Sequence, residues 1–136
     1  MAKIKGLITS DEAKKLNDEW SKTRSEAMNQ CISDVTGGKV TEDNRSSWWS
    51  IKDLKAYIKH AKKQAKELGY KMNGVRVYCG AHSEDDCYAT SFIVPTYAGS
   101  LGKDGEGEED GGGDIPGGDG LNFGDPGNPP NANYPQ

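Results

Sequence analysis

The segment from Gly99 to Gln136 is the feature that most limits how this chain can fold. It contains twelve of the 18 glycines and eight acidic residues against a single lysine. Its large apolar or aromatic residues are only Leu101, Ile115, Leu121, Phe123 and Tyr134. Such a composition offers too little apolar surface to offset the entropy of ordering the chain. The hydrophobic core must therefore come from residues 1–98, and it must be small.

This contrast predicts three parts in a chain of 136 residues, which is long enough for one ordinary domain. We expect residues 1–98 to form a single α+β domain and residues 99–120 to form a disordered, acidic, glycine-rich linker. Residues 121–136 combine apolar anchors with several prolines, which restrict the unfolded chain and lower the cost of ordering it. We expect this C-terminal arm to dock, either on the domain or on a partner.

Apolar residues spaced three and four apart predict two helices. The first begins after a capping box formed by Thr9 and Glu12, and Gly37–Gly38 ends it. Its apolar stripe is Ala13, Leu16, Trp20, Ala27, Cys31 and Val35. The second begins after Ser50 and ends at Gly69, a residue type suited to the left-handed conformation after a helix. Its apolar stripe is Ile51, Leu54, Ile58, Ala61, Ala65 and Leu68.

Two stretches of alternating residues, 75–79 and 88–94, predict strands joined by a polar connection over 80–86. A hairpin of two strands is marginal on its own. We therefore expect a third strand, from residues 3–8 or 121–123, or cover from the helices. The predicted fold is α+β, with two antiparallel helices packed on a small antiparallel β-hairpin sheet.

Charge and hydropathy narrow the classes of partner. The net charge is −4, divided into −7 from residue 99 onward and +3 before it, which is too balanced for a strong nucleic-acid binder. We interpret the lysines of the second helix as a solvated face, with nucleic-acid binding as the alternative. The N-terminus lacks the apolar run of a signal peptide, and no stretch has the length of a membrane span. We expect a cytoplasmic protein with no cofactor and neither nucleic acid nor membrane as partner.

The stretch Cys79–Cys87 is the most suggestive of chemistry, because Cys79, His82 and Cys87 follow the spacing Cys-x2-His-x4-Cys. Zinc accepts such ligands, but a structural site needs four. Candidates for a fourth are Cys31, His60 and Asp86. A redox pair is the second alternative. Because paired Cys-x2-Cys motifs are absent and the cysteine count is odd, we predict no metal site and unrelated thiols.

The adjacent residues Trp48 and Trp49 precede the second helix and cannot both face one direction. One is expected to pack against the helix, and the other either covers the core or stays partly exposed. Tryptophan and arginine are favoured at interaction hot spots, so Arg45 joins them as a candidate. The outward face of the hairpin adds three more candidates: Arg76, Tyr78 and Ile93. The competing interpretation is that both tryptophans belong to the core.

Three segments, 42–48, the helix from Ser50 and 92–96, resemble a group of small bacterial proteins of unassigned function. The closing residues, 134–136, are similar too, so the resemblance spans roughly residues 9–97 and the C-terminus. It implies one compact unit and carries no activity.

These observations predict a non-enzymatic interaction or accessory protein whose partner is another protein or a second copy of itself. No residue is assigned a catalytic role. The alternative is a small enzyme or ligand-binding protein with a shallow polar pocket around four residues: Arg45, Arg76, Tyr78 and His82.

Overall fold

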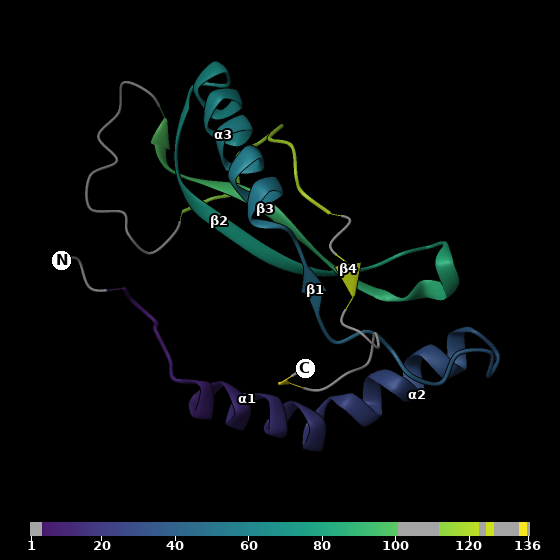
Figure 1. Cartoon of the computed structure of the whole chain (residues 1–136). Coiled ribbons are helices and arrows are strands. Elements are labelled where there is room, and N and C mark those ends of the chain that lie inside the picture. The colour runs from purple at the N-terminus through teal and green to yellow at the C-terminus, as the bar shows by residue number, and fades with distance from the viewer. Residues whose placement is uncertain (1–3, 101–111, 123–124, 127–133, 136) are drawn as a thin grey trace. The chain divides into compact units, whose positions relative to one another are not determined.

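The computed structural model is an α+β fold, as predicted (Figure 1). It describes residues 4–100, 112–122, 125–126 and 134–135. In chain order the elements are α1 (Ser10–Thr23), α2 (Ser25–Val35), β1 (Ser47–Trp48), α3 (Ile51–Glu67), β2 (Tyr70–Ala81), the 3-10 turn η1 (Asp85–Cys87), β3 (Ala89–Ser100) and β4 (Asp125–Pro126). Strands β2 and β3 pair with each other, and so do the short strands β1 and β4.

The chain divides into two compact units. The first comprises Met1–Ser46, His82–Ala89 and Pro126–Gln136, and the second comprises Ser47–Ala81 and Thr90–Asp125. The loop between the two long strands thus belongs to the first unit together with Ala89, the first residue of β3, whereas the rest of both strands belongs to the second. The expected single domain over residues 1–98 contributes to both units and stays a prediction.

The start of α1 follows the predicted capping box. The Thr9 hydroxyl accepts a hydrogen bond from the Glu12 N–H at 3.1 Å, and the Glu12 carboxylate accepts one from the Thr9 N–H at 3.0 Å. Two of the donors that a helix leaves unpaired at its first turn are satisfied in this way.

The predicted first helix is interrupted at Arg24, where α1 ends and α2 begins. The interruption moves the inward face of α2 by one position along the chain. Ile32 is almost fully buried, whereas Cys31 and Val35 are exposed. The predicted stripe is therefore wrong in α2, because it assumed one unbroken helical period from residue 13 to residue 35. It is also incomplete in the other helices, since α1 buries no residue and Ile51, Ile58 and Leu68 of the second predicted stripe are exposed.

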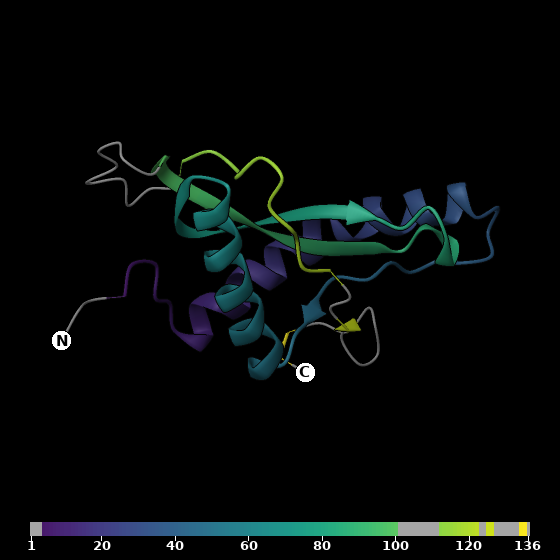
Figure 2. The same ribbon diagram turned by 90° about the horizontal axis from the view of Figure 1, so that it is seen from above.

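In the second unit α3 packs against β2 (Figures 1 and 2). The helix begins where predicted, since the Ser50 hydroxyl accepts a hydrogen bond from the Asp53 N–H at 2.9 Å. The core consists of Tyr57, Ala61 and Ile93. Half-buried side chains pack around these three: Trp49, Leu54, Met72 and Leu121.

A segment from Gly112 to Asn122 runs beside β3, on the edge opposite β2. Leu121 forms an antiparallel bridge with Ile93, and Asp114 forms one with Thr96. Leu121 therefore contributes the additional pairing expected from residues 121–123. In residues 112–120 the structure differs from the predicted disordered linker.

Backbone pairing and one buried side chain account for this difference. The Ile115 N–H donates to the Pro95 carbonyl at 3.0 Å, and the Ile115 side chain is buried. Glycine permits the close approach, because a side chain at Gly113 would meet the ring of Tyr97 at 2.7 Å. The remaining parts of the predicted linker and arm, residues 101–111, 123–124 and 127–133, lie outside the described residues.

Candidate functional site

Arg76 and Tyr78, two of the predicted binding residues, meet at Asp114. The Asp114 carboxylate accepts hydrogen bonds from the Arg76 guanidinium and from the Tyr78 hydroxyl, and Arg76 also donates to the Gly112 carbonyl at 3.0 Å. Arg76 and Tyr78 lie on β2, whereas Asp114 lies beyond β3. The two side chains therefore cross β3 and hold the returning segment in place.

The pKa shifts of these three side chains all favour the same set of protonation states. The hydrogen bond from Tyr78, followed by that from Arg76, lowers the pKa of Asp114 below its usual range. The hydrogen bond to Asp114 raises the pKa of Tyr78, and the same carboxylate raises the pKa of Arg76. Each contact thus favours a charged carboxylate, a neutral phenol and a charged guanidinium near neutral pH. The arrangement is that of a structural clasp.

Strand β2 has one open edge. Because β3 pairs with β2 on one side and with the 112–122 segment on the other, β2 is an edge strand. No strand in the described part of the chain pairs with the outer edge of β2. Along it Val75, Val77 and Cys79 are exposed, with Val77 at 60%.

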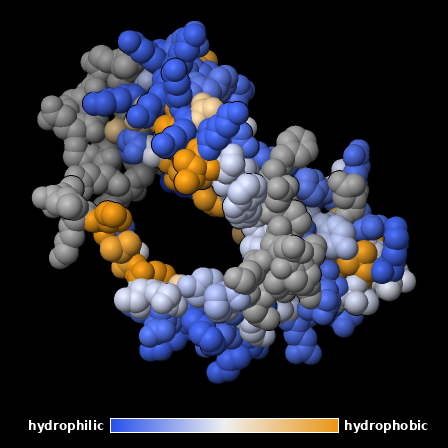
Figure 3. Space-filling model, viewed as in Figure 1, coloured by the Kyte–Doolittle hydropathy of each residue, from blue (hydrophilic) through white to orange (hydrophobic). Residues whose placement is uncertain are grey.

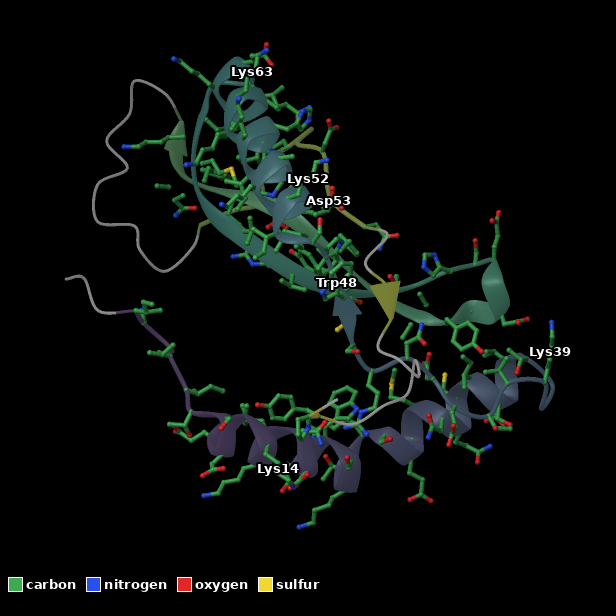
Figure 4. The ribbon with its side chains drawn as sticks, viewed as in Figure 1. Lys14, Lys39, Trp48, Lys52, Asp53 and Lys63 are labelled. Atoms are coloured by element: carbon green, nitrogen blue, oxygen red, sulfur yellow. The ribbon has the colours of Figure 1, made fainter. Side chains whose placement is uncertain are left out.

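The two tryptophans lie in different environments, which agrees with one of the two interpretations of the sequence. Trp49 is half-buried against the core, and its indole N–H donates to the Asn122 carbonyl at 2.9 Å. Trp48, labelled in Figure 4, is 61% exposed on β1. The interpretation that both belong to the core is therefore wrong.

Ile93 is 6% exposed within the core, so its predicted outward position is wrong. Both faces of β3 carry apolar side chains, and alternation alone does not tell which face meets the helix. The neighbouring Phe92 stacks on Tyr78, with ring centroids 5.3 Å apart.

Asp43 organises a polar network in the first unit. It is only 7% exposed, and its Oδ1 accepts hydrogen bonds from the backbone N–H groups of Asn44 and Ala89, each at 2.8 Å. The Asp43 N–H donates to Asn29 Oδ1 at 2.8 Å, and Asn44 Nδ2 donates to the Ala89 carbonyl at 3.1 Å. These contacts hold the end of the loop 82–89 against the chain that follows α2.

A cavity of about 130 Å³ lies beside this network, within the same unit. Its lining residues are Trp20, Ser25, Met28, Asn29, Glu42, Asp43, Asn44 and Arg45. Arg45 is the only one of these that the sequence singled out for binding. Its guanidinium donates to Asn17 Oδ1 at 3.0 Å and, at 3.4 Å, to the Asn17 carbonyl and the Ser25 hydroxyl.

One buried acceptor in the cavity wall lacks a donor. Asn44 Oδ1 is inaccessible to solvent and has no hydrogen-bond partner within the described residues. The orientation of this amide is fixed, because Nδ2 must face the Ala89 carbonyl to donate to it. Buried acceptors are nearly always satisfied in proteins, so this one marks a place where a donor is missing.

A larger groove of about 540 Å³ lies in the second unit, between α3 and residues 120–122. Its lining residues are Trp49, Asp53, Ala56, Tyr57, His60, Gly120, Leu121 and Asn122. At its rim His60 Nε2 lies 2.9 Å from Asp119 Oδ2, and this contact, with a second from Gln64, lowers the pKa of Asp119. Burial raises the pKa of Tyr57, whose hydroxyl donates to the Asp119 carbonyl at 2.8 Å. Sequence reasoning missed this groove because it joins residues far apart in the chain.

The cysteine–histidine stretch does not assemble a metal site among the described residues. No three histidine, cysteine, aspartate or glutamate side chains in that part of the chain are grouped to hold a metal ion. Cys31 and Cys79 are exposed and Cys87 is half-buried, each as a free cysteine. The His82 N–H donates to the Tyr88 carbonyl at 3.1 Å, which closes the loop around η1.

The four residues of the predicted shallow pocket divide between the units. Arg45 and His82 belong to the first, and Arg76 and Tyr78 belong to the second. Of the four, Arg45 alone is among the residues that line the two cavities described above.

Comparison of the chain with protein-family models, with curated proteins and with solved structures gave no match. The resemblance to small bacterial proteins stays a prediction. Among the described helices, none has the length and apolar character needed to cross a membrane.

Proposed function

We propose that the protein is a non-enzymatic interaction protein that associates through the open edge of β2, and that the occupant of this edge is a second copy of the chain. The observation that carries the proposal is the exposure of Val75 and Val77 along a twelve-residue edge strand without proline. An uncovered edge offers unpaired N–H and C=O groups to any strand that can align with it.

The charges on β2 favour self-pairing. In a two-fold antiparallel pair the same side chains of two copies meet across the interface. The exposed residues Asn73, Val75, Val77 and Cys79 include no Asp, Glu, Lys or Arg, so this pairing juxtaposes no such charged side chains over their length. The strand's own cations are Lys71, near its start, and Arg76, which Asp114 already neutralises.

Apolar side chains are exposed outside β2 as well. Figure 3 shows hydrophobic residues along the N-terminal segment, where Ile4, Leu7 and Ile8 are exposed, and hydrophilic side chains over α3. The N-terminal segment contains no strand among its described residues, so it lacks the regular backbone edge that β2 offers. For this reason β2 is the surface to test first.

Sedimentation velocity across a range of protein concentrations tests the proposal. We expect the unmodified chain to form dimers as concentration rises, and Val77→Lys to remain monomeric because two lysines would face apolar strand residues. Val35→Lys is the matched control, since Val35 is also a 60% exposed valine but lies on α2. A wild-type chain that stays monomeric, or a Val77→Lys variant that dimerises as well as the control, contradicts self-pairing through β2.

A further inference from the structure

The cavity beside Asp43 contains two opposite charges that the described part of the chain leaves without charged partners. The Asp43 carboxylate accepts hydrogen bonds from backbone N–H groups, and none of its partners is a cation. The Arg45 guanidinium donates only to neutral acceptors, on Asn17 and Ser25. Both side chains line the same cavity, yet no ion pair joins them.

Burial makes this arrangement less favourable than an ion pair. Asp43 is more than nine-tenths buried, and Arg45 is half-buried. Hydrogen bonds to neutral groups compensate a charge removed from water only in part, and an opposite charge nearby compensates it further. A ligand that brings one charge of each sign would compensate both groups.

The neighbouring groups define what else the ligand must carry. Asp43 and Glu42 both line the cavity, and their carboxylates are hydrogen-bond acceptors, which suits a group with several N–H donors. A primary ammonium provides three such donors. The guanidinium of Arg45 matches a carboxylate. Trp20 and Met28 supply the apolar surface for a short side chain.

We propose that this cavity binds the zwitterionic head group of a small α-amino acid, with its ammonium toward Asp43 and its carboxylate toward Arg45. The volume fits this class. About 130 Å³ is several times the roughly 10–15 Å³ that one water molecule requires, and it is below the range of about 300–1,000 Å³ typical of drug-sized ligands. The proposal is independent of self-pairing through β2, which involves the other unit.

Three probes separate the parts of the head group. Isotope-labelled full-length protein is titrated with L-alanine, with ethylamine, which lacks the carboxylate, and with propionate, which lacks the ammonium. We expect saturable shifts of the Trp20 indole N–H and of the Asn29 side-chain amide with L-alanine. We expect each single-charge probe to bind about tenfold more weakly or worse, the loss typical of one charge-assisted hydrogen bond.

Two variants assign the binding to this cavity. Asp43→Asn keeps an oxygen that can accept the backbone hydrogen bonds but removes the charge, and Arg45→Gln removes the guanidinium. Each should weaken L-alanine binding by about tenfold or more, whereas Asp34→Asn, an exposed carboxylate on α2, should leave it unchanged. Absence of saturable shifts in the wild-type protein overturns the proposal. Equal affinity for ethylamine or propionate, or an Asp43→Asn variant that folds and binds normally, overturns it as well.

Discussion

The two units are stabilised by different means. The second has an apolar core in which Tyr57, Ala61 and Ile93 bring α3 and β3 together. The first buries Ile32 but is organised mainly by hydrogen bonds that converge on Asp43. An apolar core gains stability from many interchangeable contacts, whereas a polar network depends on each donor finding its acceptor. The first unit should therefore be sensitive to small chemical changes, and the second to changes in volume.

The same difference indicates where in the molecule each kind of function should be sought. A buried carboxylate and a half-buried guanidinium beside a cavity lose hydration free energy, which lowers the stability of the fold unless an opposite charge compensates it. The first unit contains these buried charged groups. The second pairs buried polar groups through contacts such as the hydrogen bond from the Trp49 indole to the Asn122 carbonyl. The binding chemistry is thus best sought in the first unit and the association surface in the second.

Removing Tyr57 should have the largest effect. Tyr57 is 7% exposed, so Tyr57→Ala empties a core position and should lower the free energy of unfolding by about 3–5 kcal/mol. Ile51→Ala, on the same helix but 72% exposed, should change it by less than about 0.5 kcal/mol. Chemical denaturation measures both, and hydrogen exchange should show the lost protection mainly in residues 51–81 and 90–100. Equal effects of the two substitutions would contradict the assignment of the core.

Removing the Asp43 carboxylate should have a smaller but sharply localised effect. Asp43→Ala leaves the N–H groups of Asn44 and Ala89 without their acceptor, which should cost about 1–3 kcal/mol. Faster amide exchange at those two residues is the diagnostic measurement. Asp34→Ala, which removes an exposed carboxylate, is the control. If Ala89 remains as protected in Asp43→Ala as in the wild type, the network does not hold the loop.

Local signals in the sequence were sufficient for the helix starts and the fold class. Thr9, Ser50 and their partners at the third helical position are adjacent in sequence, so capping could be inferred without knowledge of the rest of the molecule. The inward face of α2 could not be inferred in this way, because no proline or glycine near Arg24 indicates that the helix is interrupted there. A shift of one residue was then enough to exchange Ile32 for Cys31 as the buried residue.

The candidate sites are formed by contacts between residues far apart in the sequence, which the composition does not predict. The residue type of Arg45 indicates a binding role, whereas nothing in the sequence distinguishes Asp43 and Asn44, whose contacts with Ala89 form only in the folded chain. Likewise, the acidic glycine-rich composition predicted disorder through residue 120. It gave no weight to Ile115, whose burial beside β3 depends on a partner strand far away in sequence.

The smallest effect we predict concerns Asp114, where the apolar unit relies on an exposed polar clasp. Its folded-state pKa is lowered by hydrogen bonds from Tyr78 and Arg76, so the contribution of the clasp is complete above the ordinary carboxylate pKa of 3.8 and is lost as pH falls through the lower, folded value. Protection of the Ile115 and Tyr97 amides, which pair the 112–122 segment with β3, should therefore decrease on acidification. Asp114→Asn should reduce that protection already at neutral pH and remove its dependence on pH in this range. Exchange rates read residue by residue by NMR measure both effects. Because Asp114 lies at the surface, with its side chain 39% exposed, the core amides of Tyr57 and Ala61 should be unaffected. If they lose protection together with Ile115, the clasp and the core form one cooperative unit. The distinction drawn between polar and apolar stabilisation then fails for this half of the molecule.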